Sequence, residues 1–265
     1  MRFDSDGGDV GVAMLRQRRR LGGILAGLTD DEWAAPSRCE KWSVRDVVAH
    51  LVSTNQFWAI SLTSGRAGNP TRFLATFDPV ASPVALVDAV ADVPAAAILE
   101  RYAESVEAMA TAIEGFDADA WAMLGEAPPG HVSLHEVALH ALWDAWIHER
   151  DVLLPLGRTQ TLEADEVKGC LQYAAALGPS FHASQGSARE GALAVEATDP
   201  DVAFVVRAGS QVVVDDGPVP DGAAVLRGDA VTLVEGLSFR EDVALALPEE
   251  HRWLLTGLDR VFDLV

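Results

Sequence analysis

The segment SLHEVALHALWDAWIHERDVLL, residues 133–154, constrains the fold of this chain most strongly. Its length and apolar content predict a helix, which Pro155 and Gly157 would end. Four ionisable side chains fall on one stripe of this helix, within a sector of about 80°: His140, Asp144, His148 and Asp151. Large apolar side chains fill other directions, so the helix should be buried. Buried charges need partners or a metal ion, because an isolated ion is costly in an apolar interior.

A second helix is predicted to begin at WSVRDVVAHL. Ser43 can cap the first backbone N–H groups, and Asp46, three residues later, completes a capping box. Trp42 and Val47 are placed to form the hydrophobic staple that often accompanies such a start. His50 then lies about two turns into a helix that runs past Trp58.

These two helices together predict a site for a divalent metal ion. Asp144 and His148 are four residues apart, so both side chains can reach one point above the helix surface. His50 can supply a third ligand from the second helix. Imidazole nitrogens with a carboxylate oxygen suit Zn²⁺ or a similar first-row ion and leave a coordination position open. His140 is a rival ligand, because the His140–Asp144 pair has the same spacing.

Two further residues near these motifs are candidates for supporting roles. Asp151, about one turn beyond His148, can orient a ligand imidazole through its second nitrogen. Cys39 lies shortly before the predicted His50 helix. A nucleophilic Cys39 would need a nearby base, and His50, the obvious one, is assigned to the metal. A small packing residue is therefore the favoured interpretation of Cys39.

The remaining sequence predicts a mainly α chain in two parts. Long helical segments up to about residue 185 imply a four-helix bundle over residues 1–185. Short β-branched runs follow, among them ALAVEA, VAFVVRA and QVVVDD. A helix is expected near Asp229–Leu237 and a last one over residues 249–262. A small α+β domain is therefore predicted over residues 187–265, with the boundary near Gly186.

Composition limits the partners and the compartment. The formal net charge of −20, from 40 acidic and 20 basic residues, argues against binding to nucleic acids or anionic membranes. No run approaches the roughly 18 apolar residues of a membrane helix. The arginine cluster in RQRRRLGGILAGL precedes an apolar stretch, but no cleavage site follows, so it is interpreted as part of a helix. Two cysteines, Cys39 and Cys170, provide no disulfide framework, and a cytoplasmic protein is expected.

Both metal motifs resemble one protein family. CEKWSVRDVVAHL looks like the N-terminal signature of the mycothiol-dependent maleylpyruvate isomerase family, which belongs to the DinB-like metal-binding bundles. DAWIHERDVLLPLG resembles the same family's Glu-x-x-x-His-x-x-Asp pattern. The resemblance implies that His50, Asp144 and His148 bind the metal and that Asp151 matches the later acid. Asp144 stands where the family has Glu, one methylene longer.

The resemblance continues into the second part of the chain. AAVLRGDAVTLVEGLSFRED is similar to a stretch of the family's sterol-carrier-like α+β domain. This implies a catalytic role for Arg240, which would hold a carboxylate of the substrate or of the thiol cofactor. The alternative for Arg240 is a surface salt bridge.

The function implied by the resemblance is that of a zinc- and mycothiol-dependent enzyme. A metal with one open position would favour the thiolate of the low-molecular-weight thiol, which adds to an electrophilic small molecule. Elimination after bond rotation gives an isomerase, and no elimination gives a thiol transferase. Two alternatives stay open: a hydrolase that uses metal-activated water, and a non-catalytic protein in which the metal only stabilises the bundle.

Overall fold

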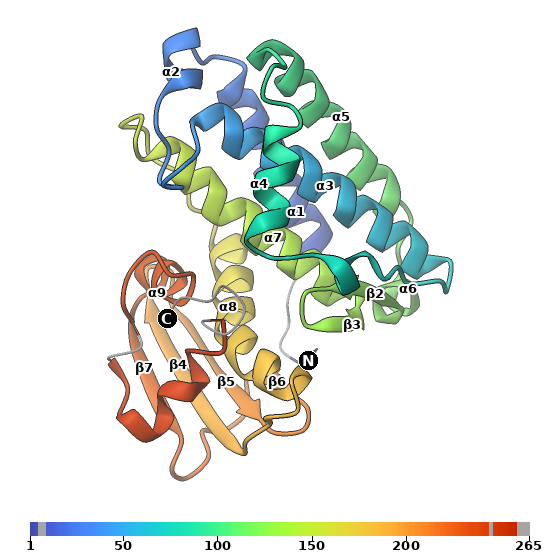
Figure 1. Ribbon diagram of the computed structural model, residues 1–265. Coiled ribbons are helices and arrows are strands. Elements are labelled where there is room, and N and C mark those ends of the chain that lie inside the picture. The colour runs from blue at the N-terminus through green and yellow to red at the C-terminus, as the bar shows by residue number, and fades with distance from the viewer. Residues whose placement is uncertain (5–8, 244–245, 259–265) are drawn as a thin grey trace. The chain divides into compact units, whose positions relative to one another are not determined.

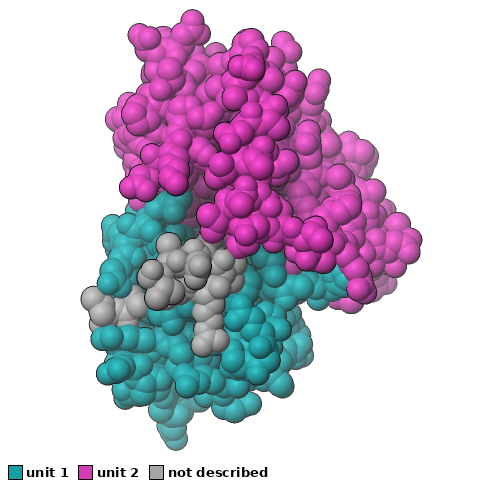
Figure 2. Space-filling model, in the orientation of Figure 1, with its two compact units in different colours: residues 1–8, 128–132, 163–265 teal, residues 9–127, 133–162 magenta. Residues whose placement is uncertain are grey.

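The computed structural model describes residues 1–4, 9–243 and 246–258 (Figure 1). Its contacts divide the chain into two compact units, coloured separately in Figure 2. Residues 9–127 and 133–162 form the bundle unit, and residues 1–8, 128–132 and 163–265 form the sheet unit. Within the described ranges, no helix combines the length and the hydrophobicity that a transmembrane span requires.

Four long helices form the bundle unit, which confirms the predicted four-helix bundle. They are α1 (Val10–Leu25), α3 (Val44–Arg66), α5 (Ala95–Ile113) and α7 (Leu134–Leu153). α3 packs against α5 and α7, and α1 packs against the same two helices, so the four enclose a common core. Along the chain, the shorter elements between these helices are α2 (Asp30–Ala34), the 3₁₀ helix η1 (Phe73–Thr76), α4 (Ala81–Asp88), α6 (Ala118–Ala122), β2 (Leu124–Ala127) and its hairpin partner β3 (Gly130–Ser133). Most of β3 belongs to the residues that group with the sheet unit.

The two helices that carry the candidate ligands begin at capping boxes. Ser43 precedes α3, and its hydroxyl accepts from the backbone N–H of Asp46, whose carboxylate accepts from the backbone N–H of Ser43. Ser133 and Glu136 form the same reciprocal pair at the start of α7. Each box satisfies backbone donors that a helix start leaves unpaired, and so it fixes where the helix begins. The start predicted at Ser43 is confirmed.

The sheet unit contains a five-stranded sheet in the order β1-β6-β5-β4-β7. Its strands are β1 (Arg2–Phe3), β4 (Gly191–Thr198), β5 (Val202–Ala208), β6 (Val213–Asp215) and β7 (Ala224–Asp229). β4 pairs antiparallel with β5 and parallel with β7. α8 (Ala164–Ser184) packs against β5 and β6, α9 (Ala230–Leu237) packs against β4 and β7, and the two helices contact each other. The predicted α+β fold of this region is confirmed.

Two features of the sheet unit differ from the sequence predictions. α8 was expected within the bundle, but its contacts with α9, β5 and β6 group it with the sheet. Its apolar residues are buried on several sides, and periodicity alone does not reveal which partner buries them. The helix expected over residues 249–262 is a 3₁₀ helix, η3 (Glu249–Leu254), and residues 259–262 lie outside the described ranges.

Candidate metal centre

The structure brings together the three predicted metal ligands. His50 comes from α3, and Asp144 and His148 come from successive turns of α7. Each of the three offers one ligand atom, and these atoms lie within 4.8 Å of one another. His148 Nε2 is 3.7 Å from Asp144 Oδ1, and the rings of His50 and His148 meet edge to face with centroids 5.0 Å apart. The bundle therefore places two imidazoles and one carboxylate around one point.

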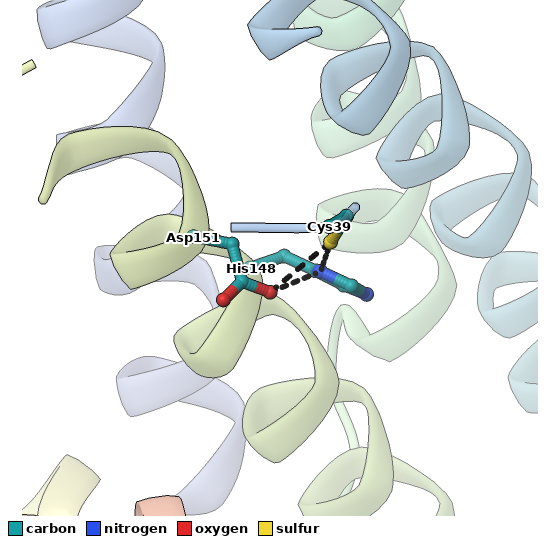
Figure 3. Close-up of side chains that lie close together, drawn as sticks. All are labelled: Cys39, His148 and Asp151. Atoms are coloured by element: carbon teal, nitrogen blue, oxygen red, sulfur yellow. Dashed lines mark hydrogen bonds and ion pairs between the residues drawn. The ribbon is translucent and has the colours of Figure 1, made fainter. Parts of the chain in front are cut away.

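The second nitrogen of His148 faces a different pair of side chains, shown in Figure 3. Nδ1 lies 3.0 Å from Asp151 Oδ2, and Asp151 is fully buried. Cys39 Sγ lies 3.4 Å from the same carboxylate oxygen and 3.7 Å from Nδ1. A carboxylate oxygen only accepts hydrogen bonds, so this contact places a proton on Nδ1 and leaves Nε2 directed toward Asp144. The predicted position of Asp151 behind His148 is observed.

Charge is distributed unevenly over the three candidate ligands. Burial, reinforced by the nearby His148, lowers the pKa of His50 to about 4. Burial also disfavours a charged His148, but hydrogen bonds with Asp151 and Cys39 outweigh it and raise the pKa of His148 to about 10. Burial opposes ionisation of Asp144, yet the imidazoles of His148 and His50 hold the pKa of this carboxyl below its usual value. At neutral pH the metal-free site thus contains a neutral His50, an ionised Asp144 and a protonated His148, which must release its Nε2 proton to bind a metal.

One buried atom of this site is left without a partner. Asp144 Oδ2 is inaccessible to solvent and accepts no hydrogen bond within the described part of the chain. A buried carboxylate oxygen in this condition is costly, and a bound water or ion is one of the partners that can satisfy such an atom. A divalent cation between Asp144 and the two imidazoles would satisfy it. The donor set therefore fits a metal such as zinc.

Aromatic side chains border the candidate ligands. The Trp42 ring lies 5.1 Å from that of His50, and the Trp58 ring lies 4.7 Å from that of His140, measured between centroids. Trp143 also meets His140 edge to face, at 5.3 Å. His140, the rival ligand, is thus packed between two indoles.

The sequence patterns did not reveal the contacts that Trp58 and Cys39 make in the structure. Trp58 follows His50 by eight residues, about 80° around the helix from it, and it carried no assigned role. Cys39 was interpreted as a packing residue, whereas its thiol contacts Asp151 and His148. No local sequence pattern predicts that contact, because tertiary interactions hold the loop before α3 against α7. One of them is the hydrogen bond that the backbone N–H of Arg38 donates to the backbone carbonyl of Asp151.

Arg240 belongs to the sheet unit, in the bend that follows α9. Its Nη1 donates to the backbone carbonyl of Ser238, and its backbone N–H donates to the carbonyl of Glu235. The side chain is partly exposed. Its assignment as a carboxylate-binding residue stays a prediction.

Comparison with known proteins identifies the bundle. Residues 14–153 match the sequence model of the family described as the mycothiol maleylpyruvate isomerase N-terminal domain, which covers more than half of the chain. The chain belongs to this family. The matched residues extend from α1 to the end of α7, so the family's domain includes His50, Asp144 and His148, whereas Arg240 lies outside it.

Two solved structures share the fold over most of the chain. One is a mycothiol-dependent maleylpyruvate isomerase, 18% identical with a TM-score of 0.60. The other is a mutant of such an isomerase with a histidine replaced by alanine, 17% identical with a TM-score of 0.61. Each comparison covers 89% of this chain and 90% of the solved one. At such low identity the likeness shows the fold, as expected for a distant member of the family. The comparison with curated proteins finds no match.

Proposed function

We propose that this chain is a metal-dependent enzyme that uses a low-molecular-weight thiol, mycothiol, to act on an electrophilic small molecule. His50, Asp144 and His148 hold the metal, a divalent ion such as zinc. Membership of the family supports the thiol, as do two structural relatives that are mycothiol-dependent maleylpyruvate isomerases. The reaction class is cis–trans isomerisation or transfer of the thiol to the substrate.

The observation that carries this proposal is the buried, unpartnered Oδ2 of Asp144 between two imidazoles. A purely structural hydrogen-bond network would be expected to satisfy this atom. The three side chains offer two nitrogens and a carboxylate oxygen, which is the ligand composition of many catalytic zinc sites. Three protein ligands leave a coordination position for the thiol, and the proposal depends on that opening.

The residues of the chain have separate roles in this proposal. His50 is neutral at neutral pH and offers a lone pair without first losing a proton. Asp151 accepts the Nδ1 proton of His148 and so orients the ring with Nε2 toward Asp144. When bound, the metal would stabilise the thiolate of the cofactor at neutral pH, and that thiolate supplies the nucleophile.

Cys39 is not the nucleophile in this proposal. Its Sγ lies on the Nδ1 side of His148 and donates to Asp151, away from the nitrogen that faces Asp144. The external thiol therefore provides the reactive sulfur.

A test is turnover of a cis-unsaturated keto acid by the zinc-loaded full chain, with and without mycothiol. The proposal predicts turnover only when both the metal and the thiol are present, and its loss in Asp144→Ala. Glu163→Ala is the matched control, because it removes a carboxylate from the partly exposed residue that precedes α8. Equal turnover without thiol would support metal-activated water instead, and binding of metal without any thiol binding would contradict the proposal.

A further inference from the structure

A second group of potential metal ligands lies on the side of His148 that faces away from Asp144. Cys39 lies in the loop before α3, and His148 and Asp151 lie about one turn apart on α7 (Figure 3). Each of these three residues offers one donor atom, and the three atoms lie within 4.8 Å of one another. The group shares only His148 with the site that contains His50, and it includes a thiol, which that site lacks.

The three donor atoms are spaced like the ligands of a tetrahedral cation. Cys39 Sγ lies 3.7 Å from His148 Nδ1 and 3.4 Å from Asp151 Oδ2, and Nδ1 lies 3.0 Å from the same oxygen. Bonds of about 2.3 Å from zinc to sulfur and about 2.0–2.2 Å to nitrogen and oxygen would separate these pairs by roughly 3.6, 3.6 and 3.4 Å. A zinc-sized ion therefore requires changes of no more than about 0.4 Å in these distances.

The loop that carries Cys39 is held in place by hydrogen bonds of its own. Ser37 Oγ accepts from the backbone N–H of Cys39 and donates to the backbone carbonyl of Trp42. The backbone N–H of Arg38 donates to the carbonyl of Asp151, which ties the loop to α7. The thiol is thus already beside the other two donors, and binding a cation would cost little further ordering.

Charge and exposure also suit a cation at this position. Asp151 Oδ1 lies 3.8 Å from Arg38 Nε, whereas Oδ2 faces Cys39 and His148. A thiolate and a carboxylate would bring two negative charges to the ion, against the single positive charge of Arg38. Cys39 is partly exposed and the His148 side chain is 14% exposed, so an ion can reach the group from solvent.

We propose that Cys39, His148 and Asp151 form a second cation site, which takes a thiophilic divalent ion of the size of zinc. The ion binds Sγ, Nδ1 and one carboxylate oxygen, and water completes the tetrahedron. Binding breaks the S–H and Nδ1–H bonds and releases both protons to solvent.

The second site fills only after the first, because a cation there must displace two protons. When both sites are occupied, the imidazole of His148 bridges the two ions. That bridging rests on the proposed function, which places a metal on Nε2, whereas the second site itself does not depend on it. Its ligands also exchange their mutual hydrogen bonds for bonds to the ion.

The test is titration of the zinc-loaded full chain with Co²⁺, whose bond to a thiolate produces a charge-transfer absorption band. We expect the band to saturate at one equivalent of cobalt. The sequence contains two cysteines, so a band can come only from Cys39 or Cys170. Cys39→Ser should show no band. Cys170→Ser, which removes the fully buried thiol on α8, is the matched control and should give the wild-type band.

Two further variants complete the test, with folding checked by circular dichroism. Asp151→Asn keeps the thiol but should weaken cobalt binding at least about tenfold, the loss typical even of residues that only support a ligand. Asp144→Ala disrupts the first site and should retain the band, so failure of the proposed function is recognised separately, by zinc content. No band in the wild type, a band in Cys39→Ser, or equal cobalt affinity in Asp151→Asn would overturn the second site.

Discussion

Asp151 Oδ2 lies 3.0 Å from His148 Nδ1, and this fully buried carboxylate also accepts from the Cys39 thiol. Both residues are on α7, three positions apart, so the helix itself sets their separation. The contact holds a proton on Nδ1 of His148 and turns Nε2, the nitrogen that would bind a metal after losing its proton, toward Asp144. Asp151 thus orients the His148 ring as a ligand, although its own carboxylate lies on the other side of the ring from the proposed metal position.

Replacement of Asp151 should weaken metal binding while leaving the ligands intact. Asp151→Asn is expected to lower zinc affinity about 10- to 100-fold, because the amide no longer polarises His148. The measurement is competition with a chelator of known affinity. Cys39→Ser keeps a donor to Asp151 and should change the affinity by less than about threefold. A large loss in Cys39→Ser would instead place the metal among Cys39, His148 and Asp151, which also lie within 4.8 Å of one another.

The shorter acid at position 144 provides a second prediction. Asp144→Ala should remove most of the bound metal, because it deletes the only carboxylate in the ligand set. Asp144→Glu restores the residue of the family pattern and should retain one equivalent of metal. Both are read by elemental analysis of folded protein, with circular dichroism as the check on folding. Retention of metal by Asp144→Ala would exclude this residue as a ligand.

The neutral, buried His140 predicts a pH dependence of stability. Its pKa is about 4 in the folded chain and about 6.5 when unfolded, so between these values only the unfolded state takes up the proton. Stability of the metal-free protein should therefore fall as the pH decreases from 6.5 toward 4, by on the order of 1–2 kcal/mol at pH 5 from this residue. Urea denaturation at pH 7 and pH 5 measures the effect. In His140→Gln, the difference in unfolding free energy between pH 7 and pH 5 should shrink by that amount. An unchanged difference would contradict a neutral, buried His140.

Arg240 is expected to affect the substrate and not the metal. Arg240→Ala should raise KM for a carboxylate-bearing substrate about 10- to 100-fold, the cost of losing a charge-assisted hydrogen bond. Zinc content should stay at the wild-type value. Arg227→Ala is the matched control, since Arg227 pairs with Glu196 on the exposed surface of the sheet unit. Equal effects of the two substitutions on KM would indicate that Arg240 is a surface residue with no role in substrate binding.

Much of the bundle could be predicted because its signals are local. Capping boxes at Ser43 and Ser133 fix the starts of α3 and α7, and the four-residue spacing of Asp144 and His148 puts both on one face. The position of His50 beside them required only that two buried helices pack together. These features depend on hydrogen bonds and periodicity within about 20 residues.

The parts that could not be predicted depend on contacts between distant segments. Cys39 reaches Asp151 across a separation of 112 residues, and no pattern around either residue encodes that approach. α8 is apolar on several sides, so its sequence is compatible with a bundle or with a sheet. Trp58 carried no predicted role, and its contact with His140 on another helix depends on tertiary packing.

The most direct test of the central claim is the zinc content of the purified, metal-replete chain beside His148→Ala and His140→Ala. The account predicts one equivalent in the wild type, its loss in His148→Ala and its retention in His140→Ala. Loss in both variants would indicate a closed site with His140 as a fourth ligand. No metal in correctly folded wild-type protein would contradict the account and leave the stripe on α7 as a buried hydrogen-bond network.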